Sequence, residues 1–119
     1  MRISELSTKT RVSADRLRRY EAAGLIASQR LANGYRDYDE RTVRHVIFIA
    51  MSREMGFSLP LIAEFLPKFQ SGKLTPQEMT EAIHRRVAEI DQVIAEQKSL
   101  KKMLLSHIDW FEAKQRKST

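Results

Sequence analysis

Residues 12–38 read VSADRLRRYEAAGLIASQRLANGYRDY, and they decide the fold of this chain. Ser13 is a favourable helix N-cap, because its side-chain oxygen can accept a hydrogen bond from a free N–H group of the first turn. Asp15 adds a negative charge where the helix dipole favours one. Gly24 suits the left-handed conformation that commonly follows the last turn of a helix. We therefore expect a short helix between Ser13 and Gly24.

The expected helix has one apolar side and one basic side. Leu17 and Tyr20 fall at helical spacing and would face the core, while Arg16, Arg18 and Arg19 occupy the rest of the cylinder. The major groove of DNA admits one helix, whose side chains reach base edges while flanking cations neutralise phosphates. The three arginines therefore predict DNA binding; the alternative is that they form an ordinary solvated face.

A tight hairpin is expected after this helix. Beyond Arg30 the chain carries Asn33-Gly34, a pair that tolerates positive φ at both central positions of a turn. Tyr35-Arg36-Asp37-Tyr38 would then form the returning strand. A basic helix with a hairpin beside it is the layout of a winged helix-turn-helix DNA-binding domain.

These residues belong to a longer pattern near the start of the chain. The pattern comprises Ile3-Ser4-Glu5-Leu6, Val12-Ser13, Leu17-Arg18, Tyr20-Glu21, Gly24-Leu25-Ile26, Arg30 and Gly34-Tyr35-Arg36-Asp37-Tyr38. In these residues and their spacing, over roughly the first 70 residues, the chain resembles the MerR family of bacterial transcription regulators.

The resemblance implies a homodimer that binds an imperfect palindrome inside an overlong promoter spacer and distorts the DNA so that RNA polymerase can open it. It also implies which residues contact double-stranded DNA from the recognition helix and the wing: Ser13, Arg16, Arg18, Arg19, Tyr20, Arg36 and Tyr38. Two residues depart from the family pattern. Arg11 replaces the usual turn glycine, and a left-handed conformation there would cost about 1 kcal/mol. Arg19 replaces the usual tyrosine, which could change the bases or phosphates that are touched.

The composition agrees with a folded protein that binds a polyanion. The 119 residues are 42% hydrophobic and 30% charged, which argues against a disordered chain, and the net charge is +6. Residues 1–36 hold eight Lys or Arg against three Asp or Glu, so +5 of that charge lies in the expected DNA-binding part. Such an excess predicts a nucleic-acid partner.

Two absences narrow the function further. The sequence contains no cysteine, which excludes disulfides, thiolate metal ligands and cysteine redox sensing among these residues. Much of the MerR family is known for sensing through cysteines, so this chain differs from those branches. No apolar run approaches the length of a membrane span and no leader is evident, which predicts a cytoplasmic protein without membrane contact.

Further helices complete the expected DNA-binding domain. These helices and their candidate N-caps are 2–10 with Ser4, 40–55 with Asp39 and 59–66 with Ser58. Pro67 discourages continuation of the last one. The domain organisation that follows is a DNA-binding domain over 1–70, a linker over 71–75, a dimerisation helix over 76–113 and a flexible tail over 114–119.

The second half of the chain reads as one long helix. Thr75-Pro76-Gln77-Glu78 is a strong helix start, because threonine can cap it, proline suits its first position and glutamate can complete a capping box. Residues at coiled-coil spacing follow: Met79, Ile83, Val87, Ile90, Ile94, Gln97, Leu100, Leu104, Ile108 and Phe111. The simplest partner for this stripe is the same helix of a second chain in antiparallel pairing. The alternative is a helix folded back on its own domain.

Within that stripe, Ile83, Val87, Ile90, Ile94, Gln97, Leu104, Ile108 and Phe111 form the predicted dimer interface, and Gln97 is a polar break that could set its register. The expected fold is therefore mainly α: a winged helix-turn-helix domain with a small β-hairpin wing, followed by a long C-terminal helix that forms an antiparallel coiled-coil dimer.

Two groups of residues are candidates for a small-molecule effector site, and no cofactor follows from the sequence. His84 and His107 lie about equally far from the midpoint of the long helix, so antiparallel pairing could bring them together as a metal or pH site; the alternative is surface histidines. The side chains of the second group could bury an apolar ligand, or they could instead pack in the core of the dimer. This group comprises Phe57, Phe65, Phe69, Met103, Trp110 and Phe111.

Three classes of function fit these observations. The first is a MerR-like transcriptional regulator. The second is an architectural or excisionase-like DNA-bending protein, against which the long dimerisation helix argues. The third is an interaction module that has lost DNA binding, against which the arginines argue. An enzyme has no support, because the sequence shows no metal-ligand set, nucleophile–base pattern or phosphate-binding glycine loop.

Overall fold

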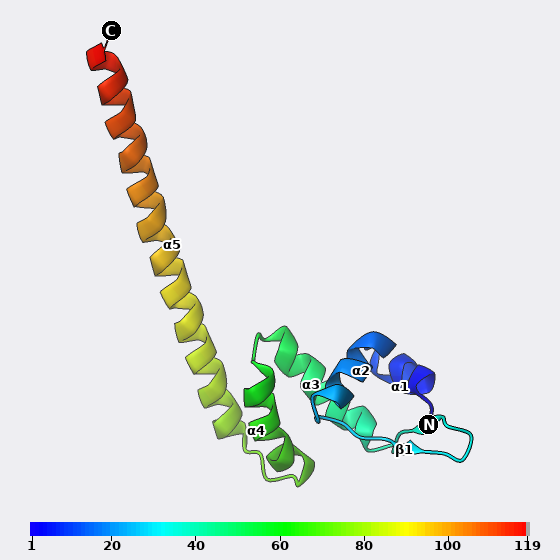
Figure 1. Cartoon of the computed structure of the whole chain (residues 1–119). Coiled ribbons are helices and arrows are strands. Elements are labelled where there is room, and N and C mark those ends of the chain that lie inside the picture. Colours follow the sequence, from blue (N-terminus) through cyan, green and yellow to red (C-terminus); the bar gives the residue numbers. More distant parts are fainter. Residues whose placement is uncertain (119) are drawn as a thin grey trace. The chain divides into compact units, whose positions relative to one another are not determined.

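The computed structural model describes residues 1–118 and divides the chain into two compact units, Met1–Pro76 and a second unit from Gln77 on. The elements in chain order are α1 (Ile3–Thr10), α2 (Ala14–Ala22), β1 (Gln29–Arg30), β2 (Arg36–Asp37), α3 (Thr42–Glu54), α4 (Leu59–Gln70) and α5 (Pro76–Ser118) (Figure 1). The predicted fold class, mainly α with a small hairpin and a long C-terminal helix, is confirmed. Within residues 1–118, no helix combines the length and apolar character that crossing a membrane requires.

Helix α2 begins and ends as its sequence predicts. The Ser13 side chain accepts a hydrogen bond from the Arg16 N–H at 3.2 Å, which caps the first turn. At the other end, Gly24 has φ +77°, and the Leu25 N–H donates to the Tyr20 carbonyl at 2.9 Å. This left-handed closure turns the chain away from the helix axis and toward the hairpin.

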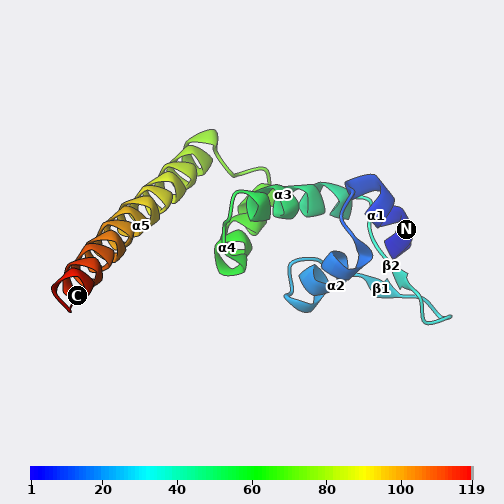
Figure 2. The ribbon, with the colours of Figure 1, turned by 90° about the horizontal axis from the view of Figure 1, so that it is seen from above.

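The core of the first unit is built where its four helices meet. Leu6 from α1, Leu17 from α2, Val46 and Ile49 from α3, and Ile62 from α4 are almost completely buried. Each side chain buried in this way contributes about 1.5–3 kcal/mol relative to exposure. The hairpin of β1 and β2 extends beyond α1 and α2 as a projecting arm (Figure 2).

The wing is an antiparallel pair in which Gln29 lies opposite Asp37 and Arg30 lies opposite Arg36. Its loop differs from the prediction. Gly34 alone in the loop has positive φ, at +87°, so the expectation of positive φ at both Asn33 and Gly34 is wrong. The loop instead has three residues and ends at the left-handed glycine, a common alternative hairpin closure.

The ends of three other helices differ from the sequence expectations. Helix α1 already includes Ser4, and no side chain caps it. Helix α3 begins at Thr42, and Asp39 instead accepts a hydrogen bond from the Arg41 N–H at 2.8 Å in the preceding turn. Helix α4 continues through Pro67 to Gln70. The ring stack of Phe69 on Phe48, with centroids 4.3 Å apart, holds that last turn against α3 although proline removes one helical hydrogen bond.

Helix α5 also extends beyond the expected end near residue 113. It is helical through Ser118, so the flexible tail predicted for 114–119 is wrong as far as the described residues go, and residue 119 lies outside them. The sequence of this last turn explains the extension. Lys114, Arg116 and Lys117 have good helix propensity, and their charges suit the negative end of the helix dipole.

Arg11, in the turn between α1 and α2, has φ +60° and ψ +25°. It is the one residue other than glycine with positive φ among residues 1–118, as its position in the sequence suggested. Two hydrogen bonds fix the turn: the Arg11 N–H donates to the Ser7 carbonyl at 2.8 Å, and the Ser7 hydroxyl donates to the Val12 carbonyl at 2.7 Å. The fold therefore holds Arg11 in a conformation that favours glycine.

Replacing Arg11 with glycine should raise the free energy of unfolding by about 1 kcal/mol, because glycine has no Cβ to clash in the left-handed region. Urea unfolding followed by circular dichroism measures this change. Arg11→Ala is the matched control, since alanine removes the long side chain but keeps the Cβ. An Arg11→Gly protein no more stable than Arg11→Ala would contradict the assignment of strain to this residue.

Candidate nucleic-acid interface

The three arginines predicted for DNA contact are exposed on α2 and point in different directions. The Arg16 guanidinium donates to the Tyr20 hydroxyl at 2.9 Å, and Arg18 forms an ion pair with Asp15 at 2.9 Å. The structure records no ion pair or side-chain hydrogen bond for Arg19 within residues 1–118. Arg19 lies opposite the buried face of the helix, so its guanidinium is available to a ligand.

Arg18 faces a cavity that we call the wing cavity. It has a volume of about 360 Å³ and is lined by Arg2, Ile3, Ser4, Arg18, Arg30, Gly34, Tyr35 and Arg36. The Arg2 guanidinium lies 4.6 Å from the centre of the Tyr35 ring, and Arg30 donates to the Gly34 carbonyl at 3.0 Å. Four arginines, one just before α1, one from α2 and one from each strand, therefore converge with no acidic side chain in the lining.

Sequence reasoning had placed only Arg18 and Arg36 of this cavity among the site residues. Arg30 could have been found, because it sits across the hairpin from Arg36, and a pair of like charges directly opposite each other is unfavourable without an anionic partner. Arg2 and Tyr35 carried no such signal. Their proximity results from the way the fold brings the start of α1 beside the hairpin.

Glu21 connects the recognition helix to the wing. Its carboxylate accepts hydrogen bonds from the Tyr38 hydroxyl at 2.7 Å and from the Arg36 guanidinium at 3.1 Å. Burial, with the Glu21 carboxylate as the second cause, raises the pKa of the Tyr38 phenol to about 12. The phenol thus remains a neutral donor to Glu21 at physiological pH.

Two tyrosines implied as DNA contacts lie in the core. Tyr38 is 1% exposed and Tyr20 is 5% exposed, and the hydroxyl of each is engaged, with Glu21 and Arg16 respectively. A direct contact through the Tyr38 side chain is therefore inconsistent with this structure. Both tyrosines position the arginines beside them. Of the other predicted contacts, Ser13 remains at the exposed start of α2, and Arg36 is half-buried at the wing cavity.

The start of the chain also holds the wing in place. The nitrogen of Met1 lies 2.7 Å from the Asp37 carboxylate, and the Tyr38 N–H donates to the Met1 carbonyl at 2.7 Å. Met1 thereby runs beside β2. This contact adds a second connection that holds β2 in place, besides the hydrogen bonds to Glu21.

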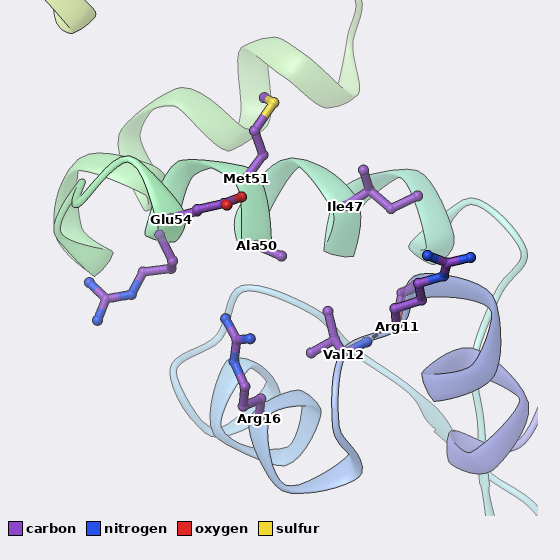
Figure 3. Close-up of a pocket in the computed structure, with 9 residues that line it drawn as sticks. Arg11, Val12, Arg16, Ile47, Ala50, Met51 and Glu54 are labelled. Atoms are coloured by element: carbon purple, nitrogen blue, oxygen red, sulfur yellow. Dashed lines mark hydrogen bonds between the residues drawn. The ribbon is translucent and has the colours of Figure 1, made fainter.

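Arg16 faces a second hollow, on the other flank of α2, that we call the α3 groove. It has a volume of about 640 Å³ and is lined by Thr10, Arg11, Val12, Arg16, Ile47, Ala50, Met51, Arg53 and Glu54. Figure 3 shows the Arg16 side chain extending from α2 toward α3, and Arg11 at the end of α1 on the other side of Val12. The recognition helix is therefore bordered by arginines on both flanks.

The residues of the predicted dimer interface are exposed on the surface of helix α5. The seven apolar residues of this interface, Ile83, Val87, Ile90, Ile94, Leu104, Ile108 and Phe111, are between 41% and 62% exposed. Gln97 is exposed as well. Among residues 1–118, no group of three or more side chains has the arrangement of a metal site, and His84 and His107 lie apart on this helix.

The geometry of the first unit defines a winged helix-turn-helix DNA-binding protein. Residues 1–68 of the chain match the family described as MerR HTH family regulatory protein. Residues 43–107 match a second family, described as MerR, DNA binding. The chain belongs to the MerR family and is a DNA-binding transcriptional regulator.

Individual relatives agree with this assignment. The HTH-type transcriptional regulator HmrR of Rhizobium leguminosarum bv. viciae is 31% identical over 104 residues, which cover 87% of this chain and 81% of HmrR. A probable heavy metal-dependent transcriptional regulator of Haemophilus influenzae is 33% identical over 114 residues, 95% of this chain and 87% of that protein. The lead(II) complex of PbrR691 from Ralstonia metallidurans CH34 is similar in structure, with a TM-score of 0.73, 26% identity and coverage of 89% and 83%. The relatives are named as regulators and not as enzymes.

Replacing Tyr38 with phenylalanine should lower the free energy of unfolding by about 1.5–3 kcal/mol at pH 7, because a buried hydrogen bond to a carboxylate is lost. The raised pKa of Tyr38 means that its contribution is present below pH 10.0 and is lost as the pH rises toward about 12. The difference between wild type and variant should therefore narrow over that range. Urea unfolding at a series of pH values measures it.

Tyr35→Phe is the control for this experiment, because Tyr35 is a wing tyrosine that is 55% exposed. It should change the stability little at any pH. Equal effects of Tyr35→Phe and Tyr38→Phe would show that the Glu21 contact does not stabilise the unit.

Proposed function

We propose that this protein is a homodimer that binds an inverted-repeat promoter site and distorts the DNA for RNA polymerase in response to a small-molecule effector. The observation that carries the proposal is the basic recognition helix α2, with the wing cavity on one flank and further arginines on the other. Family membership supports the DNA-binding part independently.

The recognition helix suits a major groove. Arg19 projects from the middle of its outer face, and Arg18 from the side of the wing, where planar guanidinium groups can reach guanine edges. The other three arginines of the wing cavity, Arg2, Arg30 and Arg36, would neutralise backbone phosphates next to that groove. Glu21 of α2 is hydrogen-bonded to Arg36 and Tyr38 of the wing. These bonds would keep the helix that contacts the bases and the wing that contacts the phosphates in a fixed arrangement.

Helix α5 supports the homodimer. Its 43 residues would span about 65 Å at about 1.5 Å per residue. The apolar stripe stays about half exposed on a single helix, and pairing with the same stripe of a second copy would bury it. Antiparallel pairing satisfies a two-fold axis, which would place two recognition helices on one inverted repeat.

Distortion of the DNA follows from such a dimer. Two recognition helices at a fixed separation can enter both half-sites only if the intervening DNA adapts its bend or twist, at a cost on the order of 1–6 kcal/mol. An effector that favours one dimer geometry would then change the DNA shape offered to RNA polymerase. The shape of the DNA would thereby link effector binding to the response of RNA polymerase at the promoter.

The effector of this protein would differ from those named for some relatives. The Haemophilus influenzae relative is named for heavy metals, and PbrR691 is described with lead(II). The present sequence contains no cysteine. Soft metal ions prefer thiolate ligands, so we propose an effector of another chemistry, held where two α5 helices meet.

Selection of bound sequences from a random duplex pool, with purified protein at a fixed near-physiological salt concentration, tests the proposed function. Two inverted half-sites at constant spacing are the expected result. Tight binding without sequence enrichment would support an architectural DNA-bending protein instead. Absence of binding, with and without cell extract as a source of effector, would overturn the proposal.

Arg18→Ala should weaken binding to the selected site by about 1–3 kcal/mol, because a bidentate contact with a base is lost. Fluorescence anisotropy on the selected site and on random duplex measures the effect. Lys73→Ala, which removes the same charge outside the wing cavity, is the matched control. An equal loss on both DNAs would make Arg18 a phosphate contact.

Charged substitutions in the stripe, Ile90→Glu and Ile94→Glu together, should give monomers, because two buried apolar contacts would be replaced by carboxylates. Sedimentation velocity measures the mass. Arg85→Glu changes a charge on the same helix outside the stripe and should leave the dimer intact. Persistence of a dimer in the double variant would contradict pairing through α5.

A further inference from the structure

The further inference concerns Arg11 and the α3 groove. Arg11 has a conformation that favours glycine, yet it carries a long cationic side chain. That side chain is exposed, and the structure records no ion pair or side-chain hydrogen bond for it within residues 1–118. Residues that the surrounding fold holds in such a conformation cluster at functional sites, so the conformation of Arg11 points to a function for this position.

The α3 groove shows where that ligand lies. Arg11 and Arg16 line it from the turn and from α2, and Arg53 and Glu54 line it from α3. The Arg53 guanidinium is partly engaged by the Phe57 carbonyl at 3.0 Å. Three guanidinium groups against one carboxylate give the groove a positive charge, which suits an anion.

The position of the groove identifies the anion. Arg18 lines the wing cavity on one flank of α2, and Arg16 lines the α3 groove on the other flank. A helix in the major groove lies between the two phosphate backbones of the duplex. The wing cavity supplies Arg2, Arg30 and Arg36 for one backbone. The opposite backbone would pass the other flank, where Arg11 and Arg16 line the α3 groove (Figure 3).

We propose that the α3 groove binds a backbone phosphate of double-stranded DNA on the flank of α2 opposite the wing, and that Arg11 makes this contact while Arg16 adds positive charge to the same groove. The proposal rests on the proposed DNA-binding function and adds a phosphate site to it. In this view the strained turn is maintained because its arginine neutralises a phosphate. Arg11 thus lowers the stability of the folded protein and raises its affinity for DNA.

The apolar part of the groove does not favour another occupant. Ile47 and Met51 are 49% and 45% exposed, and Figure 3 shows the Met51 side chain on the far side of α3 from Arg16. The cations Arg11 and Arg16 line the groove from the turn and from α2. An uncharged apolar partner would have to desolvate these cations without compensation. The phosphate backbone of DNA would compensate the positive charges of Arg11 and Arg16.

The test compares Arg11→Gly, Arg11→Gln and Arg11→Lys in the full-length protein by fluorescence anisotropy. Each variant is measured on random-sequence duplex DNA and on the selected site over a range of salt concentrations. Loss of one phosphate contact should weaken binding about 8-fold near 0.1 M salt and reduce the slope of log K against log salt by about 0.9. Arg11→Gly and Arg11→Gln should both show this loss, although only glycine relieves the strain. Arg11→Lys should retain most of the affinity and the wild-type slope.

The controls separate this proposal from the proposed function. Lys73→Gln removes one positive charge outside the groove and should leave the slope unchanged. Three results would overturn the phosphate site: an unchanged slope in Arg11→Gly, a loss of affinity confined to the selected site, or a slope in Arg11→Lys that differs from the wild type. The proposed function would still stand in each case if the wild-type protein binds DNA. If the wild-type protein does not bind DNA at all, the proposed function is refuted instead.

Discussion

The bidentate use of the Glu21 carboxylate is the contact on which the DNA-binding surface depends. One oxygen accepts the Tyr38 hydroxyl and the other accepts the Arg36 guanidinium, at 2.7 and 3.1 Å. The hairpin itself pairs over only two residues in each strand and cannot be stable alone. Glu21 ties it to α2, and Met1 ties it to α1. The wing cavity exists because both connections hold.

Positive charge is distributed around α2 rather than concentrated on it. Arg18 joins the arginines of the wing cavity, Arg16 joins Arg11 in the α3 groove, and Arg19 stands between the two flanks. Asp15 and Glu21 compensate Arg18 and Arg36 within the unit, and a polyanionic partner would compensate the remaining excess of positive charge. The left-handed conformation of Arg11 is a further cost of the same kind. Both costs are recovered only when a polyanion is bound.

The sequence predicted most of the first unit because its signals are local. Ser13 and Gly24 act on the residues next to them, and Leu17 and Tyr20 follow one helical period, so α2 was predicted with its correct limits. Errors arose where a distant contact overrides a local preference. Pro67 does not end α4, because the stacking of Phe69 on Phe48 holds the following turn.

The sequence by itself determined that five helices form and that the recognition helix is basic, since both depend on residues close together in the chain. The resemblance to a family with glycine at the position of Arg11 indicated the left-handed conformation of this residue. Only the tertiary structure decided which cations meet. Arg2 and Tyr35 became part of the wing cavity, and Tyr38 became a buried donor to Glu21 instead of a surface contact. These outcomes depend on how α1, α2 and the hairpin pack. Neither periodicity nor composition encodes that packing, because the residues concerned are far apart in the chain.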